Sequence, residues 1–223
     1  VRALRLAHGG FQDALKLDPR LLDAYYGLGL YHYSLADLPA LLRPLVAALL
    51  PAGDAALGLQ QLTLVAERGS YLKMTARMAL FRIYAGQEAR YAEAYALGGD
   101  LLRRYPGNPD LYFATAHAAS ELGRFPEALE VARALAAQIG SGHPRFRDLV
   151  PRQQQLLGKL HMDRGEYAAA LDFFQRAIQS PTAPRYRWVT AWAWVRSGMI
   201  HDLLGDRDEA RRRYRETLAI GEN

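Results

Sequence analysis

The side chains of this chain best suited to catalysis or metal binding are its six histidines, because the sequence has no cysteine. The absence of cysteine excludes thiolate ligands, disulfides and cysteine nucleophiles. His8, expected near a frayed helix end, and His143, expected in a loop, have no second ligand residue at a spacing that would hold a metal. The HExxH, GxSxG, P-loop and GxGxxG motifs are all absent. The sequence therefore predicts a protein that is not an enzyme and that holds no metal or cofactor.

The composition places these side chains on helices. Half of the 223 residues are hydrophobic and 23% are charged, which is ordinary for a folded protein. Alanine, leucine and arginine, which favour helices, are abundant, whereas isoleucine, valine and threonine, which favour strands, are sparse. We therefore expect an all-α fold.

The formal net charge of +5 raises the question of a polyanionic partner. The densest basic run, at residues 211–215, follows Asp206, Asp208 and Glu209 on one expected helix. Acidic residues at the start of a helix and basic residues later suit the helix dipole and pair at i,i+4. We interpret the run as a solvated helix face, and we expect no nucleic-acid partner.

Two segments, residues 157–178 and 197–218, repeat one pattern of small and aromatic residues. The matched pairs, each 40 residues apart, are Gly158/Gly198, His161/His201, Gly165/Gly205, Ala170/Ala210 and Phe174/Tyr214. Further copies place Ala116, Gly123, Ala128 and Ala94 at corresponding positions. A small residue on each helix of a hairpin lets the two backbones approach, and the glycine between them turns the chain.

These residues resemble the tetratricopeptide repeat (TPR) family, whose pattern is W-x2-L-G-x2-Y followed by Gly, Ala, Phe, Ala and Pro. The residues that follow this pattern are Trp194, Gly198, Gly205, Ala210 and Tyr214, and again Leu157, Gly158, Gly165, Ala170, Phe174 and Ala177. Arg82 stands where the pattern has a small residue, and Gly98 where it has an aromatic one. The resemblance covers nearly the whole chain and implies a right-handed α-α superhelix of helical hairpins.

We expect residues 1–223 to form a single repeat array. Its expected parts are a partial repeat at 1–19 and hairpins at about 20–69, 70–106, 108–140, 144–181 and 184–220. Extra residues at 141–151 and 180–188 are expected to lengthen the first helices that follow, because proline is tolerated in a first turn.

The pattern begins part-way through a repeat, so we expect a fragment of a longer protein. The segment GLGLYHYSLADLP and the apolar run after it are similar to a group of bacterial TPR proteins whose members often carry an export signal. This similarity favours a bacterial origin and the cell envelope over the cytoplasm.

That apolar run, LPALLRPLVAALLP, lies within the first complete hairpin. At 100° per residue its leucines share one side, so we expect an inserted amphipathic helix at about 38–50. At ~1.5 Å per residue it spans roughly 20 Å, short of the ~30 Å hydrocarbon core of a bilayer, so we expect no integral membrane span. Three roles stay open for it: packing on the hairpins, docking a partner or a second copy, and lying on a membrane surface.

Three further histidines, His32, His161 and His201, occupy the place where the repeat pattern usually has tyrosine. Equivalent places in adjacent hairpins lie about 8–10 Å apart, which is too far for a shared metal with bonds of about 2.1 Å. We interpret these histidines as structural.

The resemblance also implies a concave groove lined by positions 2, 5, 9 and 12 of each first helix. These positions hold Asp23, Tyr26, Leu30 and Tyr33; Asp110, Phe113, His117 and Ser120; Arg152, Gln155, Lys159 and Met162; and Trp192, Val195, Met199 and Asp202. The expected partner-binding residues among them are Tyr26, Tyr33, Phe113, His117, Gln155, Lys159 and Met162. For Trp192, Val195 and Met199, partner contact and coverage by the end of the array both stay open.

A groove that mixes aromatic, Met and polar side chains suits an extended peptide or a helix. We therefore expect a non-catalytic scaffold whose partner is another protein. The alternatives are self-association through residues 38–50 or through the Trp188–Trp194 face, and membrane-surface association through residues 38–50. TPR proteins that hold a chaperone's carboxyl terminus use Lys and Asn at groove positions 5 and 9. The corresponding pairs Tyr26/Leu30, Phe113/His117 and Gln155/Lys159 do not reproduce this, so that partner is disfavoured.

Overall fold

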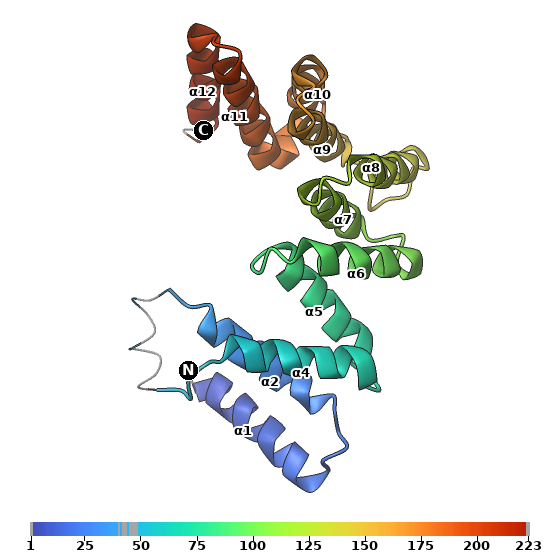
Figure 1. Ribbon diagram of the computed structural model, residues 1–223, viewed down its shortest axis with the longest axis vertical. Helices are drawn as coiled ribbons and strands as arrows, with labels where there is room; N and C mark the ends of the chain where they lie inside the picture. Colours follow the sequence, from blue (N-terminus) through green and yellow to red (C-terminus); the bar gives the residue numbers. More distant parts are fainter. Residues whose placement is uncertain (1, 40, 42–43, 45–48, 222–223) are drawn as a thin grey trace. The chain divides into compact units, whose positions relative to one another are not determined.

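The computed structural model describes residues 2–39, 41, 44 and 49–221, which form helices joined by short connections (Figure 1). The elements are α1 (Arg2–Leu17), α2 (Ala24–Ala36), α4 (Ala55–Arg68), α5 (Lys73–Ala85), α6 (Tyr91–Arg104), α7 (Pro109–Glu121), α8 (Phe125–Gly140), α9 (Val150–Asp163), α10 (Tyr167–Gln179), the 3₁₀ helix η1 (Ala183–Tyr186), α11 (Arg187–Leu203) and α12 (Arg207–Gly221). The described residues contain no strand. The all-α fold class is confirmed.

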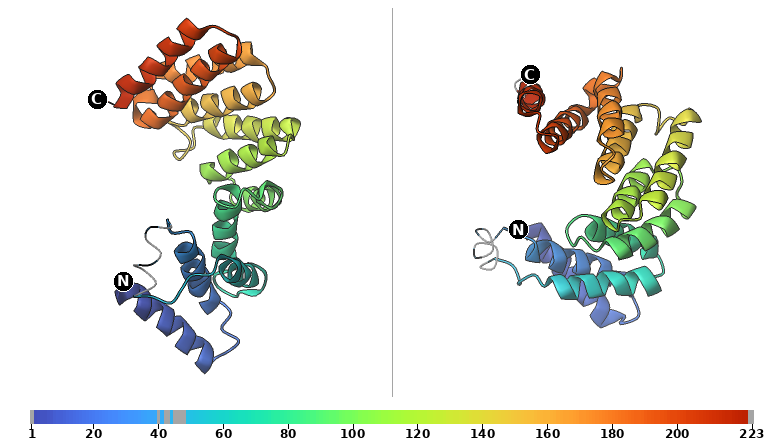
Figure 2. Two further views of the ribbon diagram at one scale, coloured as in Figure 1. Left: turned by 60° about the vertical axis from the view of Figure 1, so that its left-hand side comes forward. Right: turned by 45° about the horizontal axis from the view of Figure 1, so that its top comes forward.

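The chain divides into two compact units, Val1–Ala89 and Arg90–Asn223. The first unit contains α1, α2, α4 and α5, and the second contains α6 to α12. Within each unit, every α-helix packs against the next one along the chain, as the pairs α2 with α4, α9 with α10 and α11 with α12 illustrate (Figure 2). Packing between sequence neighbours is the architecture of helical-hairpin repeats.

Glycine allows the close approach of paired helices. A Cβ added to Gly158 of α9 would lie 2.5 Å from the Phe174 ring of α10, and one added to Gly198 of α11 would lie 2.5 Å from the Tyr214 ring of α12. Ala170, one turn before Phe174, is fully buried. The residues aligned in the two sequence copies thus make equivalent helix contacts.

Glycine also closes the turns between hairpin helices. Gly123, Gly165 and Gly205 have φ angles of 70°, 75° and 82°, in the left-handed region that disfavours side chains. Ala89, 34 residues before Gly123, has φ of 49° and is the one non-glycine residue with positive φ in the described part of the chain. Because this conformation costs an L-residue roughly 1–2 kcal/mol, the turn between α5 and α6 is strained where the others are not.

The extra residues before α9 form a packed loop, so the expectation that they lengthen the helix is wrong. Helix α9 begins at Val150, and residues 141–149 precede it as turns. Phe146 in this loop is fully buried and meets the Tyr112 ring edge-on at 6.0 Å. Residues 183–186, in the second insertion, form η1 ahead of α11. Burial of the Phe146 side chain holds this loop in place, and the helical periodicity of the sequence does not reveal that contact.

The expected inserted helix at 38–50 lies for the most part outside the described residues. The described residues that follow are held to unit 1 through backbone carbonyls. The Tyr31 hydroxyl donates a hydrogen bond to the carbonyl of Pro51 at 3.0 Å, and the Arg5 guanidinium donates one to the carbonyl of Leu49. These contacts fasten the end of the apolar run to α1 and α2.

His8 is packed in the interior of unit 1, so its expected place at a frayed end is wrong. Its side chain is buried, and its ring centroid lies 4.3 Å from that of Tyr31 and 5.8 Å from that of His32. Burial, and secondly the neighbouring His8, lower the pKa of His32. His32 is therefore neutral at pH 7 and acts as a packed ring in the contact between α1 and α2.

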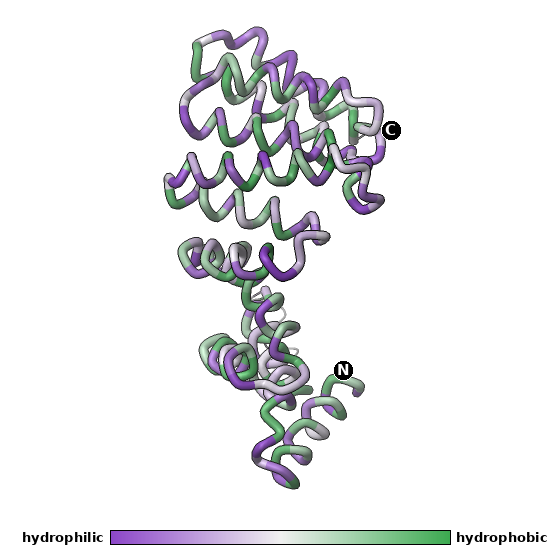
Figure 3. The backbone as a smooth tube through the Cα atoms, turned by 90° about the vertical axis from the view of Figure 1, so that its right-hand side faces the viewer, coloured by the Kyte–Doolittle hydropathy of each residue, from purple (hydrophilic) through white to green (hydrophobic). Residues whose placement is uncertain are grey.

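Hydrophobic and hydrophilic residues alternate along the helices of each unit (Figure 3). This pattern is typical of helices that bury one face and expose the other. Within the residues that the structure describes, no helix combines the length and the apolar character needed to cross a bilayer.

Candidate protein-binding site

Three first helices of the second unit, α7, α9 and α11, are connected through Arg152. The Arg152 guanidinium lies 4.1 Å from the ring centroid of Phe113 on α7 and 5.6 Å from that of Trp188 on α11. It also pairs with the carboxylate of Asp110 on α7 at 3.2 Å. We call Phe113, Arg152 and Trp188 the aromatic–arginine row. In this row Arg152 lies within cation–π distance of both rings and connects the three helices.

Beside this row lies an ionic group that we call the Lys159 cluster, composed of Ser120, Glu121, Lys159 and Asp163. The Lys159 ammonium lies 2.6 Å from Asp163 and 3.1 Å from Glu121. The Ser120 hydroxyl donates a hydrogen bond to Asp163 at 2.7 Å. Lys159, expected to bind a partner, is thus paired within the protein, and the cluster joins α7 to α9.

His117 lies between the Lys159 cluster and α6. Its ring meets the Tyr91 ring edge-on at 5.6 Å, and its Nδ1 lies 3.5 Å from Glu121. Burial, and secondly the nearby positive charge of Lys159, lower the pKa of His117. At pH 7 this imidazole is therefore a neutral, half-buried group of α7.

The most exposed part of this face is on α11. Trp188 and Trp192, one turn apart, are 53% and 50% exposed, and Met199 is also exposed. The Arg196 guanidinium lies 5.1 Å from the Trp192 ring centroid. Its Nη1 is buried and has no hydrogen-bond partner. Burial lowers the pKa of Arg196, and Asp163 partly opposes this effect.

Sequence reasoning placed Trp192 among the groove positions and Trp188 on a face that could self-associate, but it missed Arg196. The family pattern singles out neither residue, because Trp188 lies four residues before position 2 of the first helix and Arg196 falls between positions 5 and 9. The available signal was the spacing of Trp188, Trp192 and Arg196 at i, i+4 and i+8, which places all three on one helix face.

Other sequence-predicted residues of this unit have structural contacts. Met162 packs against the core cluster that contains Phe174. Asp202 accepts a hydrogen bond from the Tyr214 hydroxyl at 2.8 Å and pairs with Arg207 at 2.7 Å, and these contacts lower the pKa of Asp202. Val195 and Gln155 are half-buried, on α11 and α9 respectively.

The first unit brings its predicted residues together in a hollow of about 510 Å³ between α2 and α5. Tyr26, Leu30 and Tyr33 line it from α2, and Met78 and Arg82 line it from α5. Arg82, which departs from the repeat pattern, thus contributes a cation to this hollow.

Two predicted residues of α2 serve mainly to hold this unit together. The Tyr33 hydroxyl donates a hydrogen bond to Glu88 at 2.8 Å, and burial, followed by Glu88, strongly raises the pKa of Tyr33. The Asp23 carboxylate accepts hydrogen bonds from the backbone amides of Ser70, Tyr71 and Leu72, the last at 2.8 Å. Asp23 therefore caps the start of α5 and is unavailable to a ligand.

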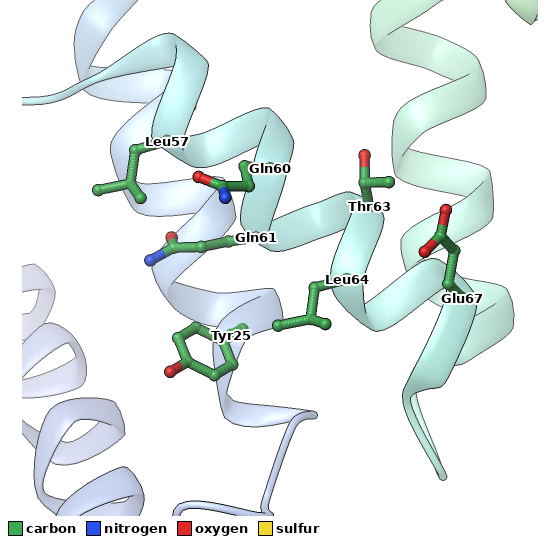
Figure 4. A pocket seen from close by; sticks show the side chains of 7 residues that line it. All are labelled: Tyr25, Leu57, Gln60, Gln61, Thr63, Leu64 and Glu67. Carbon is green, nitrogen blue, oxygen red and sulfur yellow. The ribbon is translucent and has the colours of Figure 1, made fainter.

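A second hollow of the first unit, of about 500 Å³, lies between Tyr25 of α2 and one side of α4 (Figure 4). Leu57, Gln61 and Leu64 extend from α4 toward it, and Gln61 has a buried Oε1 without a hydrogen-bond partner. None of the sequence-predicted residues lines this hollow.

The remaining histidines of the repeat pattern are engaged within their own hairpins. His161 Nδ1 lies 2.6 Å from Glu166, and its ring stacks on Phe173 at 5.0 Å. His201 Nδ1 lies 3.6 Å from Asp206. The described residues include no group of three or more His, Asp or Glu side chains arranged to hold a metal ion.

The packing of successive helices in each unit is that of a helical-repeat protein. A family model described as tetratricopeptide repeat matches residues 87–150, which include α6, α7 and α8. Together with the all-helical hairpin architecture of the described residues, this match supports a tetratricopeptide repeat protein. No curated protein matches the sequence.

Proposed function

We propose that the chain is a non-catalytic scaffold that binds a segment of a partner protein on the face formed by α7, α9 and α11. Tetratricopeptide repeats are generally protein–protein interaction modules, and this supports a protein as the partner. The observation that carries the proposal is the aromatic–arginine row with its neighbour Trp192. Trp188 and Trp192 remain half exposed although the arginines beside them are half-buried.

The chemistry of this face suits a peptide segment. Tryptophan and arginine are the residues that most often dominate binding energy at protein interfaces. The Lys159 cluster and the Asp110–Arg152 pair hold their own charges in place, so these groups shape the surface without requiring counter-ions from a ligand. Such a preorganised surface loses little conformational entropy when a partner binds.

The test is a crosslinked pull-down from native extract with a Trp188→Ala/Trp192→Ala variant. The matched control is Tyr105→Ala, which removes another exposed aromatic side chain of the second unit. We expect one or more proteins to be captured by the wild type and by Tyr105→Ala but lost from the tryptophan variant. Equal capture by all three proteins would refute binding on this face.

Self-association is measured on the same proteins by the dependence of their mass in solution on concentration. A scaffold of the proposed kind stays monomeric without its partner. A concentration-dependent dimer that the tryptophan substitutions abolish would show that this face binds a second copy instead.

A further inference from the structure

Every cation of the proposed binding face except one pairs with a carboxylate among the described residues. Asp110 pairs with Arg152, Asp163 and Glu121 pair with Lys159, and Asp202 pairs with Arg207. Arg196 is the remaining cation of this face, and it has no salt bridge within the described part of the chain. The carboxylate whose charge acts on it, Asp163, already accepts hydrogen bonds from Ser120 and Lys159.

An unpaired guanidinium in a half-buried position is energetically unfavourable. Burial removes part of the hydration of Arg196, and the Nη1 that is sealed from solvent donates to no acceptor. Stacking on Trp192 compensates for only part of this loss. A partner that supplies one acceptor with negative charge would satisfy the group, since guanidinium binds carboxylate through a planar pair of donors.

The neighbours of Arg196 specify what must accompany that charge. Trp192 and Trp188 provide exposed ring surface on the same side of α11, and Arg152 connects Trp188 to Phe113 on α7. A bound segment therefore continues from Arg196 across aromatic surface. Because the other cations of the face are neutralised, a run of acidic residues or a polyanion would meet Glu121, Asp163 and Asp202 as repulsive charges.

We infer that Arg196 binds one acidic side chain, Asp or Glu, within an extended segment of a partner protein, and that an adjacent apolar residue of that segment lies on Trp192. The inference rests on the proposed function and adds to it the sequence character of the partner. It makes Arg196 a determinant of specificity on this face.

The test uses a phage library of random peptides fused at their carboxyl ends, so that no terminal carboxylate is free. Selections are run on the wild type, on Arg196→Gln and on Arg133→Gln. Arg133 is an exposed arginine of α8, so its substitution makes the same change of charge away from the face. Arg196→Lys, which keeps the charge and loses the planar donor pair, serves as a second variant, and thermal melts followed by circular dichroism establish that each variant is folded.

We expect peptides selected on the wild type and on Arg133→Gln to share one acidic position next to an apolar residue. This acidic preference should disappear on Arg196→Gln and weaken on Arg196→Lys. For the best peptide, made with an amidated terminus, changing its acidic residue to the amide should reduce affinity about tenfold or more on the wild type. The same change should have almost no effect on Arg196→Gln.

Outcomes that overturn the inference are distinct from those that overturn the proposed function. Selected peptides without an acidic position, or an acidic preference that persists on Arg196→Gln, would refute the role of Arg196 and leave binding on the tryptophan face intact. Peptides that bind Trp188→Ala/Trp192→Ala as well as they bind the wild type, or no selected peptides at all, would refute the proposed function and the inference together.

Discussion

The contact between Gly158 and Phe174 gives a quantitative test of how α9 and α10 pack. Gly158→Ala adds a methyl group whose carbon would lie 2.5 Å from both Cδ1 and Cε1 of Phe174. Phe174 is fully buried, so its ring has no solvent-filled space into which to turn. Overpacking of this kind costs about 1–3 kcal/mol, whereas alanine in place of glycine within a helix gains about 1 kcal/mol. We therefore expect Gly158→Ala to lower the free energy of unfolding by about 0–2 kcal/mol.

Gly99→Ala is the matched control. Gly99 lies in the interior of α6, and the nearest atom to an added Cβ is an Arg103 side-chain nitrogen at 3.9 Å. Without a clash, the substitution should raise the free energy of unfolding by about 1 kcal/mol through helix propensity alone. The same chemical change in the same unit is thus expected to differ between the two sites by about 1–3 kcal/mol.

Urea denaturation followed by tryptophan fluorescence measures both effects. All three tryptophans, at positions 188, 192 and 194, belong to the second unit, so their emission reports on the unit that contains both glycines. Unchanged m-values would show that the substitutions act on stability alone. Equal stabilisation by Gly158→Ala and Gly99→Ala would refute the close contact of α9 with α10. Adding Phe174→Leu to Gly158→Ala should recover stability beyond the sum of the single effects, because the ring that clashes is removed.

Ala89→Gly should stabilise the first unit by about 0.5–1 kcal/mol, because glycine adopts the positive φ of this turn without strain; a lower melting temperature would contradict this. Ser120→Ala should destabilise the second unit by about 1–2 kcal/mol, because a buried hydroxyl that donates to the Asp163 carboxylate is lost; unchanged urea unfolding would show that the bond contributes nothing. The pKa of His32 is lowered in the folded state, so as the pH falls this imidazole is protonated in the unfolded state before it is protonated in the folded state. The free energy of unfolding is therefore highest above about pH 6.5 and declines as the pH falls below it. His32→Gln should reduce this decline, measured as urea midpoints by circular dichroism at pH 7.5 and 5.5; an identical pH dependence in both proteins would exclude His32 as its source.

The sequence by itself determined the helical-hairpin architecture, because the relevant interactions are local and repeated. The aligned residues Gly158 and Gly198 permit the same helix contacts, and Gly165 and Gly205 permit the same turns. These requirements depend on backbone space and φ, which residue type alone largely dictates. The Asp208 and Glu209 carboxylates likewise pair with the arginines that follow them on α12, as their spacing predicts.

The tertiary structure alone decided where a side chain finds its partners. The loop before α9 is fixed by Phe146 against Tyr112, 34 residues away in the sequence, and His8 is buried by contacts with α2. Periodicity does not encode such contacts, because they depend on which helix faces meet.

The proposed binding face shows the same difference between what the sequence determines and what the tertiary structure decides. The family pattern predicted groove positions for Phe113 and Lys159, yet it could not show that Lys159 pairs with two carboxylates whereas Arg196 has no salt bridge within the described residues. Whether a charge is satisfied depends on the side chains that three helices bring within about 4 Å of it. The sequence determines which charges are present, and the packing of α7, α9 and α11 decides which of them has a salt-bridge partner.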